Sequence, residues 1–132
     1  MNQTDLFRKL GAALKNTRWS WGAVRADGTV ILRIWEDQTR THEGLRYVRV
    51  TRQERQNPKH PGHQERLEHV ALARRGAKCY MVVCKARDVN ASPRSIESFN
   101  ETEVFVGGNI IELDGDWWIQ MAEPVSLKSA SA

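Results

Sequence analysis

The 132-residue sequence predicts an α+β fold, in which one or two helices flank a curved, mainly antiparallel sheet or a partly closed β-barrel. Two observations support this prediction. Short β-prone runs dominate the chain, and two pairs of them are joined by Asp-Gly turns, which favour antiparallel hairpins. Only two segments have helical periodicity. We expect a single domain over residues 1–125 and a frayed tail over 126–132.

The two helical segments lie at 4–14 and at about 63–75. In the first, leucine and phenylalanine recur every three to four residues, and Thr4 is the expected N-cap. The second has basic residues in its last turn, which suit the helix dipole, and Gly76 as its end. Both segments therefore predict short amphipathic helices.

The first hairpin is predicted from 21–25 and 29–35, joined at Asp27-Gly28. Residues 47–51 alternate apolar and basic side chains, which is typical of a strand with one solvent-exposed face. Residues 78–85 are almost continuously apolar, which predicts a central strand with both faces covered. The remaining predicted strands are 95–99, 104–106, 109–113 and 117–121, with a bend at Gly107-Gly108 and a turn at Asp114-Gly115-Asp116.

Composition excludes several protein classes. Hydrophobic residues make up 40% of the chain and charged residues 27%, which argues against general disorder. No apolar run approaches the roughly 18 residues of a membrane helix, so we expect no membrane partner. Because no apolar signal segment follows Met1, a cytoplasmic location is expected.

Charge is distributed unevenly along the chain. Residues 38–78 carry ten Lys/Arg and four Asp/Glu, a sum of +6, whereas residues 97–132 carry one and seven, a sum of −6. Segments 1–37 and 79–96 each carry +2, which gives the total of +4. A basic middle attracts polyanions or acidic partners if it forms one face. The alternative is an ordinary solvated loop and helix face.

Five tryptophans are present, and the segment Trp19-Ser20-Trp21-Gly22 is the most informative. Its indoles suit stacking on a flat ligand, the serine offers a hydroxyl, and the glycine permits close approach. The alternative is that these indoles fill a small barrel. Trp117 and Trp118 are adjacent on a predicted strand, so one faces the core and the other faces outward.

The usual local signatures of catalysis and metal binding are missing from the sequence. His60 and His63 have no cysteine pair or aspartate at ligand spacing, and Cys79 and Cys84 fall on opposite faces of one predicted strand. There is no Gly-x-Ser-x-Gly motif, no phosphate-binding glycine loop and no acidic residue two positions before Lys85. We therefore expect no metal, no cofactor and no locally encoded catalytic residue.

Five segments carry a resemblance to a known family: Trp19-Ser20-Trp21-Gly22-Ala23, Val30-Ile31-Leu32-Arg33-Ile34-Trp35, Glu65-Arg66-Leu67-Glu68-His69, Ser92-Pro93-Arg94-Ser95-Ile96 and Asp114-Gly115-Asp116-Trp117-Trp118. Over residues 4–122 the chain resembles the SRA-like domains of McrA-type HNH restriction endonucleases. These belong to the PUA-like set, with the ASCH, EVE and YTH domains, whose curved sheet or barrel holds an extruded modified base in an aromatic pocket. The HNH metal module is missing from the sequence, so the resemblance implies a reader of modified DNA without nuclease activity.

The resemblance implies a base pocket and a backbone-binding rim. The base pocket comprises Trp19, Ser20, Trp21, Gly22, Trp35 and Asp37, the aspartate accepting from an exocyclic amine. The nucleic-acid backbone contacts Arg18, Arg46, Arg49, Arg52, Arg55, Lys59 and Arg94. The expected partners are nucleic acid, DNA in preference to RNA, and a separate nuclease or defence protein.

Two other functions remain open. Small ASCH-type proteins resemble this chain in size and fold class, and some hydrolyse acylated nucleosides with lysine, threonine and glutamate side chains; Lys85 is then the candidate. Alternatively, the acidic C-terminal segment mimics nucleic acid in a phage or mobile-element inhibitor of a host defence complex.

Overall fold

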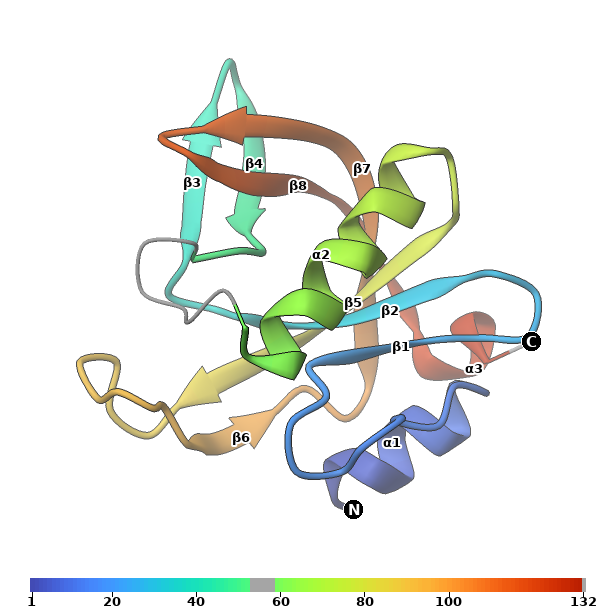
Figure 1. The fold of residues 1–132 in the computed structure, drawn as a ribbon. Coiled ribbons are helices and arrows are strands. Elements are labelled where there is room, and N and C mark those ends of the chain that lie inside the picture. Colours follow the sequence, from blue (N-terminus) through green and yellow to red (C-terminus); the bar gives the residue numbers. More distant parts are fainter. Residues whose placement is uncertain (53–58, 132) are drawn as a thin grey trace.

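The computed structural model describes residues 1–52 and 59–131 (Figure 1). In chain order the elements are α1 (Gln3–Lys9), β1 (Gly22–Val24), β2 (Val30–Trp35), β3 (Thr39–His42), β4 (Leu45–Arg49), α2 (Pro61–Arg74), β5 (Cys79–Ala86), β6 (Ile96–Phe99), β7 (Glu103–Leu113), β8 (Asp116–Ser126) and α3 (Leu127–Ala130). The fold is thus α+β, with three helices among the described residues. Within that part of the chain, no helix combines the length and the apolar character that crossing a membrane requires.

The strands form one open sheet in the order β1-β2-β5-β7-β8-β4-β3, and β6 also pairs with β5. Most neighbouring strands are antiparallel, which confirms the expected pairing. The exception is β2 and β5, which run parallel with Val30 opposite Cys79. After β2 the chain makes the β3–β4 hairpin and α2 before it enters β5. A long connection of this kind brings a chain back to the same end of a sheet, as parallel pairing requires.

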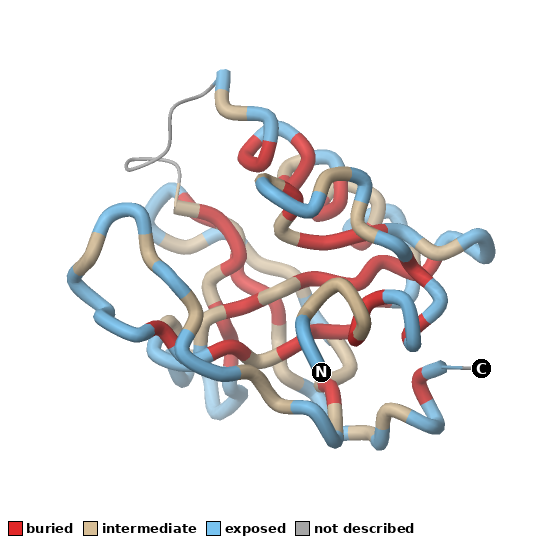
Figure 2. Tube along the Cα trace, turned by 90° about the horizontal axis from the view of Figure 1, so that it is seen from below, coloured by how far each residue is buried: buried red, intermediate tan, exposed pale blue. Residues whose placement is uncertain are grey.

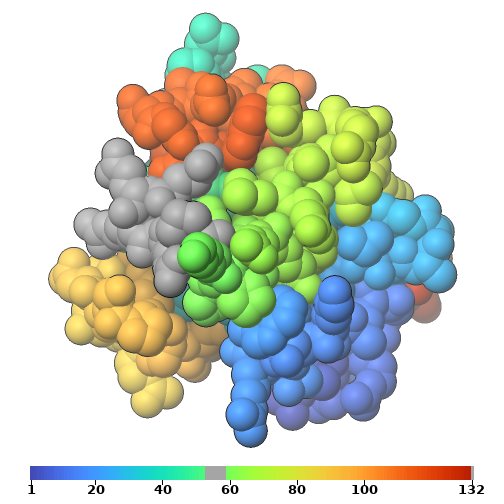
Figure 3. Space-filling model, in the orientation of Figure 1, coloured from blue at the N-terminus to red at the C-terminus, as the bar shows by residue number. Residues whose placement is uncertain are grey.

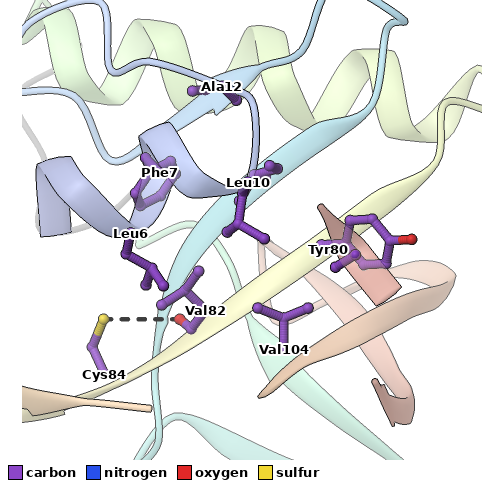
Figure 4. Packing of buried hydrophobic residues seen from close by; sticks show 11 residues of the cluster. Leu6, Phe7, Leu10, Ala12, Tyr80, Val82, Cys84 and Val104 are labelled. Carbon is purple, nitrogen blue, oxygen red and sulfur yellow. Dashed lines mark hydrogen bonds between the residues drawn. The ribbon is translucent and has the colours of Figure 1, made fainter. Parts of the chain in front are cut away.

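The helices cover both faces of the sheet. On one face Leu6 and Phe7 of α1, and Leu10 directly after it, are fully buried against β2 and β5 (Figure 4). Ala130 of α3 belongs to the same cluster. On the other face α2 packs Val70 and Ala73 against the curled inner surface of the sheet. Figure 2 shows the buried residues concentrated where strands and helices meet. Each large apolar side chain so buried contributes about 1.5–3 kcal/mol.

The helix termini differ from the sequence prediction. The N-cap of α1 is Asn2 and not Thr4, two residues earlier than expected, and the Asn2 side chain accepts a hydrogen bond from the Asp5 amide (2.9 Å). The helix ends before Gly11, which adopts a positive φ of 81°. α2 starts at Pro61, and the His60 imidazole accepts from the Gly62 amide (3.0 Å). Proline at the first helical position has no amide to leave unsatisfied, so it suits this start.

The structure confirms several strand predictions. The Asp27-Gly28 hairpin forms, and β5 lies inside the sheet between β2 and β7. Cys79 and Cys84 are buried in the two different core clusters on opposite faces of β5. Trp118 is 7% exposed whereas Trp117 is half-buried, so this pair also divides as expected.

Two predictions need correction, and one strand was missed. β7 runs through the position of the expected bend and accommodates it as a register shift around Gly107. The polar strand β3 was not predicted, because it has no apolar alternation. The expected frayed tail is instead the helix α3, since Ala130 is 1% exposed and its carbonyl accepts a hydrogen bond from the Arg25 guanidinium.

Candidate functional site

A cavity of about 530 Å³ lies between the segment before β1, the ends of β2 and β4, the start of α2 and the loop before β6. Its aromatic side chains are Trp19, Trp21, Trp35 and His60. Six arginines also line it: Arg18, Arg33, Arg49, Arg52, Arg66 and Arg94. Among the described residues no aspartate or glutamate belongs to this lining. The cavity therefore combines aromatic surfaces with a strongly positive wall.

The aromatic wall exists because β1 is much shorter than β2. β1 pairs with β2 only from Gly22 onward, and the chain before it continues along the β2 edge, where the Arg33 amide donates to the Trp21 carbonyl (2.9 Å). The Trp21 ring stacks on His60, with centroids 5.5 Å apart and planes 17° apart. All three cavity tryptophans are half-buried, so they are not enclosed in the core.

The first turn of α2 packs closely against this wall. In Figure 3 the start of α2, in green, lies beside the N-terminal part of the chain, in blue. A Cβ atom at Gly62 would lie 2.6 Å from the Trp19 carbonyl oxygen and 2.9 Å from the Trp21 ring. Only glycine fits at this distance. The contact between α2 and the preceding segment therefore fixes where both indoles lie.

Arg66 of α2 ties the walls of the cavity together. Its side chain is buried and donates hydrogen bonds to the carbonyl oxygens of Val50 (2.9 Å), Trp21 (2.9 Å) and Arg33 (2.6 Å). These carbonyls belong to three separate segments: the end of β4, the chain before β1, and β2. Burial, assisted by the nearby Arg33 charge, lowers the pKa of Arg66 to about 10, so the side chain still carries its charge at neutral pH.

Arg33 lies on β2 next to Arg66, and burial lowers its pKa as well. Its guanidinium donates to the side-chain oxygen of Gln3 (3.1 Å). Within residues 1–52 and 59–131, neither Arg33 nor Arg66 forms an ion pair. The cavity thus has two neighbouring, desolvated cations that neutral oxygen atoms hold in place.

Two other arginines of the cavity are paired with carboxylates. Arg94 makes a bidentate contact with Asp37 (2.7 and 2.8 Å) and lies 5.3 Å from the centre of the Trp35 ring. Arg49 contacts the Gln38 side chain and lies 3.7 Å from Asp116. Hydrogen bonding from Arg94 lowers the pKa of Asp37, which keeps that carboxylate ionised.

The predicted base-pocket residues divide into two groups. Trp19, Trp21 and Trp35 line the cavity, whereas Ser20 and Asp37 do not. Ser20 is 3% exposed, and its hydroxyl donates to Glu65 (3.3 Å) and accepts from the Asn16 amide (3.0 Å). Asp37 already accepts two hydrogen bonds from Arg94. The roles predicted for Ser20 and Asp37 in reading a base are therefore not supported by their positions.

Gly22 lines a different hollow, of about 490 Å³, on the α2 side of Trp19. Glu65 and His69 of α2 also border this second cavity, together with Lys15. Burial raises the pKa of Glu65 and lowers that of His69 to about 4. Trp19 borders both cavities, so its ring forms part of the partition between them.

The predicted backbone-binding residues also divide. Arg18, Arg49, Arg52 and Arg94 line the first cavity. Arg46 and Lys59 are exposed elsewhere, Arg46 donating to Thr39 (3.4 Å) on β3. Arg55 lies outside the described residues. Sequence reasoning missed Arg33 and Arg66 as cavity residues, although a cation inside the apolar run of β2 is a signal that could have identified Arg33.

The residues proposed for the two other functions lie elsewhere. Lys85 is exposed, pairs with Glu97 (3.3 Å) and lines neither cavity. The acidic C-terminal segment is partly neutralised, since Asp114 pairs with Arg40 and Asp116 with Arg49. No three histidine, cysteine or acidic side chains of the described residues lie close enough together to hold a metal ion.

Comparisons of the chain with family models, with curated proteins and with solved structures found no match. Function therefore has to be inferred from the chemistry of the cavity. Its aromatic surfaces and concentrated positive charge favour a flat ligand that is attached to an anion.

Proposed function

We propose that this chain is a nucleic-acid-binding module of PUA-like architecture that takes a modified, flipped DNA base into the cavity between Trp19, Trp21 and Trp35. The observation that carries the proposal is the meeting of three half-buried indoles and six arginines around one cavity. A nucleotide has the matching parts, because its base stacks on aromatic rings and its phosphate attracts guanidinium groups.

The energies are compatible with base flipping. Removing a base from the stack costs a few kcal/mol. Stacking on an aromatic side chain returns about 1–3 kcal/mol per base. The Trp21–His60 stack holds one such surface in place before the ligand arrives, which reduces the entropy lost on binding.

The arginines at the rim provide the sequence-independent part of the affinity. Arg18 is exposed beside Trp19, and Arg94 is held over Trp35 by Asp37. Contacts between such groups and phosphates release counterions, so binding weakens steeply as salt rises. We propose no nuclease activity for the chain itself, and a separate nuclease or defence protein as the partner that acts on the DNA.

The test is a binding screen with four duplexes of one sequence, carrying cytosine, methylcytosine, hydroxymethylcytosine or glucosylated hydroxymethylcytosine. Affinity is measured by fluorescence anisotropy at about 50 and about 200 mM salt, a range over which six phosphate contacts would cost roughly a thousandfold. We expect one modified duplex to bind at least tenfold more tightly than the unmodified one at both salt concentrations. Equal affinity for all four would exclude reading of these three modifications.

A further inference from the structure

The cavity offers mainly hydrogen-bond donors. Three side-chain acceptors in its wall, those of Gln38, His60 and Thr51, are occupied, and the fourth is the exposed Ser92 hydroxyl at the rim. The Gln38 oxygen accepts from Arg49, and His60 accepts from the Gly62 amide. The Thr51 hydroxyl accepts from the Trp117 amide (2.9 Å) and donates to Asp116 (2.9 Å). A ligand that enters this cavity therefore meets guanidinium groups rather than engaged acceptors, so it has to supply acceptors of its own.

Arg33 and Arg66 strengthen the requirement that the ligand supply hydrogen-bond acceptors. Each is a cation withdrawn from water, and in the described part of the chain neither has a carboxylate partner. Burying a charge that has no carboxylate within ion-pair distance is costly, and the Arg33 charge adds repulsion at Arg66. Their neutral partners, the Gln3 side chain and three backbone carbonyls, satisfy hydrogen bonds but do not neutralise the charge. A bound anion would relieve both costs.

We infer, on the basis of the proposed function, that the nucleotide in this cavity carries an oxyanion, a carboxylate or a phosphate, which is bound by Arg33 and Arg66. Guanidinium groups bind such anions through paired, charge-assisted hydrogen bonds. A methyl substituent offers no acceptor and would leave these donors desolvated without a partner. The oxyanion has two sources, an acidic substituent on the flipped base or the phosphate of a nucleotide that enters whole.

The experiment compares probes that differ in this one group. One pair is a duplex with a single central 5-carboxylcytosine and the same duplex with 5-methylcytosine. A second pair is deoxycytidine 5′-monophosphate and deoxycytidine, used as competitors. We expect the oxyanion member of at least one pair to bind at least tenfold more tightly. A gain in the first pair identifies the base substituent as the source, and a gain in the second identifies the phosphate.

Variants locate the effect. Arg33→Gln should abolish the tenfold gain, Arg33→Lys should keep part of it, and the exposed α1 variant Arg8→Gln should keep all of it. The inference is overturned if neither pair shows a gain in the wild-type chain, or if the gain survives in folded Arg33→Gln. Because the first outcome needs only wild-type protein, a variant that fails to fold does not decide the matter.

These outcomes also separate the inference from the proposed function. A preference for methylcytosine over cytosine, with no gain in either probe pair, overturns the oxyanion but leaves modified-base reading intact. Tight binding of the free monophosphate with equal binding of all duplexes keeps the oxyanion and excludes modified-base reading.

Discussion

Four residues on the sheet-facing side of α2 are polar and buried: His63, Glu65, Arg66 and His69. Helices usually bury an apolar stripe, and the helical spacing of Leu67, Val70 and Ala71 suits this role. Of these only Val70 is fully buried, whereas the other two are half-buried. A helix that turns charged and imidazole groups toward a sheet loses stability compared with an apolar one. In α2 one of these polar groups, Arg66, instead holds the backbone carbonyls that border the cavity.

His69 makes stability depend on pH. Burial lowers the pKa of its imidazole to about 4, below the value of about 6.5 for an unfolded chain. Above about pH 6.5 the imidazole is neutral in both states; as pH falls from there toward 4, the unfolded chain takes up a proton that the folded chain refuses. Between about pH 7.5 and about pH 4.5 the free energy of unfolding should therefore fall by about 2.5 kcal/mol from this group alone.

The measurement is urea unfolding at about pH 7.5 and about pH 4.5 for the wild type, His69→Gln and the β3 control His42→Gln. The drop on acidification should be smaller in His69→Gln and unchanged in His42→Gln. Identical drops in all three proteins would show that His69 is not held neutral by the fold.

At the scale of elements, local signals were sufficient for some features and insufficient for others. The Asp27-Gly28 hairpin and the apolar strand β5 follow from adjacent residues, and both were predicted. The parallel pairing of β2 with β5 depends on the β3–β4 hairpin and α2 between them, which no short pattern encodes. The cavity residues also differ in how far local sequence predicts them. The tryptophans lie near one another in the sequence, whereas Arg66 reaches the cavity only through the packing of α2.

Gly62 tests the contact between α2 and the aromatic wall. In Gly62→Ala the new methyl group would meet the Trp19 carbonyl oxygen at 2.6 Å, so the helix or the indole segment has to move. We expect the free energy of unfolding to fall by about 1–3 kcal/mol and tryptophan fluorescence to shift.

Gly108→Ala is the matched control, since its methyl group would meet the flexible end of the Gln120 side chain. It should cost less than Gly62→Ala and leave the cavity indoles in place. A smaller loss of stability in Gly62→Ala than in Gly108→Ala would contradict the close packing described above.

At the scale of the whole molecule, Arg66 joins segments that are far apart in the chain. Replacing it by leucine removes the guanidinium donor from the Arg33 and Val50 carbonyls, and leaves the Trp21 carbonyl with the Arg33 amide alone. Arg66→Leu should therefore lower the free energy of unfolding by about 3–5 kcal/mol, the range found when one partner of a buried charged contact is removed.

Chemical denaturation of Arg66→Leu beside Arg75→Leu measures this effect, because Arg75 is exposed at the end of the same helix. The control should change stability by less than about 0.5 kcal/mol. Similar stabilities for the two variants would mean that Arg66 does not hold the segments together.

The fold brings the acidic C-terminal segment close to part of the basic middle of the chain. The acidic C-terminal segment and the basic middle meet in the β8–β4–β3 part of the sheet, where Asp114 faces Arg40 and Asp116 faces Arg49. The arginines around the cavity come from the residues before β1, from β2, from the end of β4 and the residues after it, from α2 and from the loop before β6. The positive charge around the cavity is therefore a product of the tertiary structure and not of the basic segment alone.

The most direct test of the central claim is the affinity of Trp21→Ala, compared with Trp117→Ala, for the duplex that binds best in the modification screen. Trp117 is a half-buried indole outside the cavity, with the Arg74 guanidinium 4.0 Å from its ring centre. If the cavity stacks a base, Trp21→Ala should lose about 10- to 100-fold in affinity, which corresponds to about 1–3 kcal/mol of stacking, while folded Trp117→Ala binds as the wild type does. Equal affinities for the two folded variants would contradict the proposal that this cavity is where the base binds.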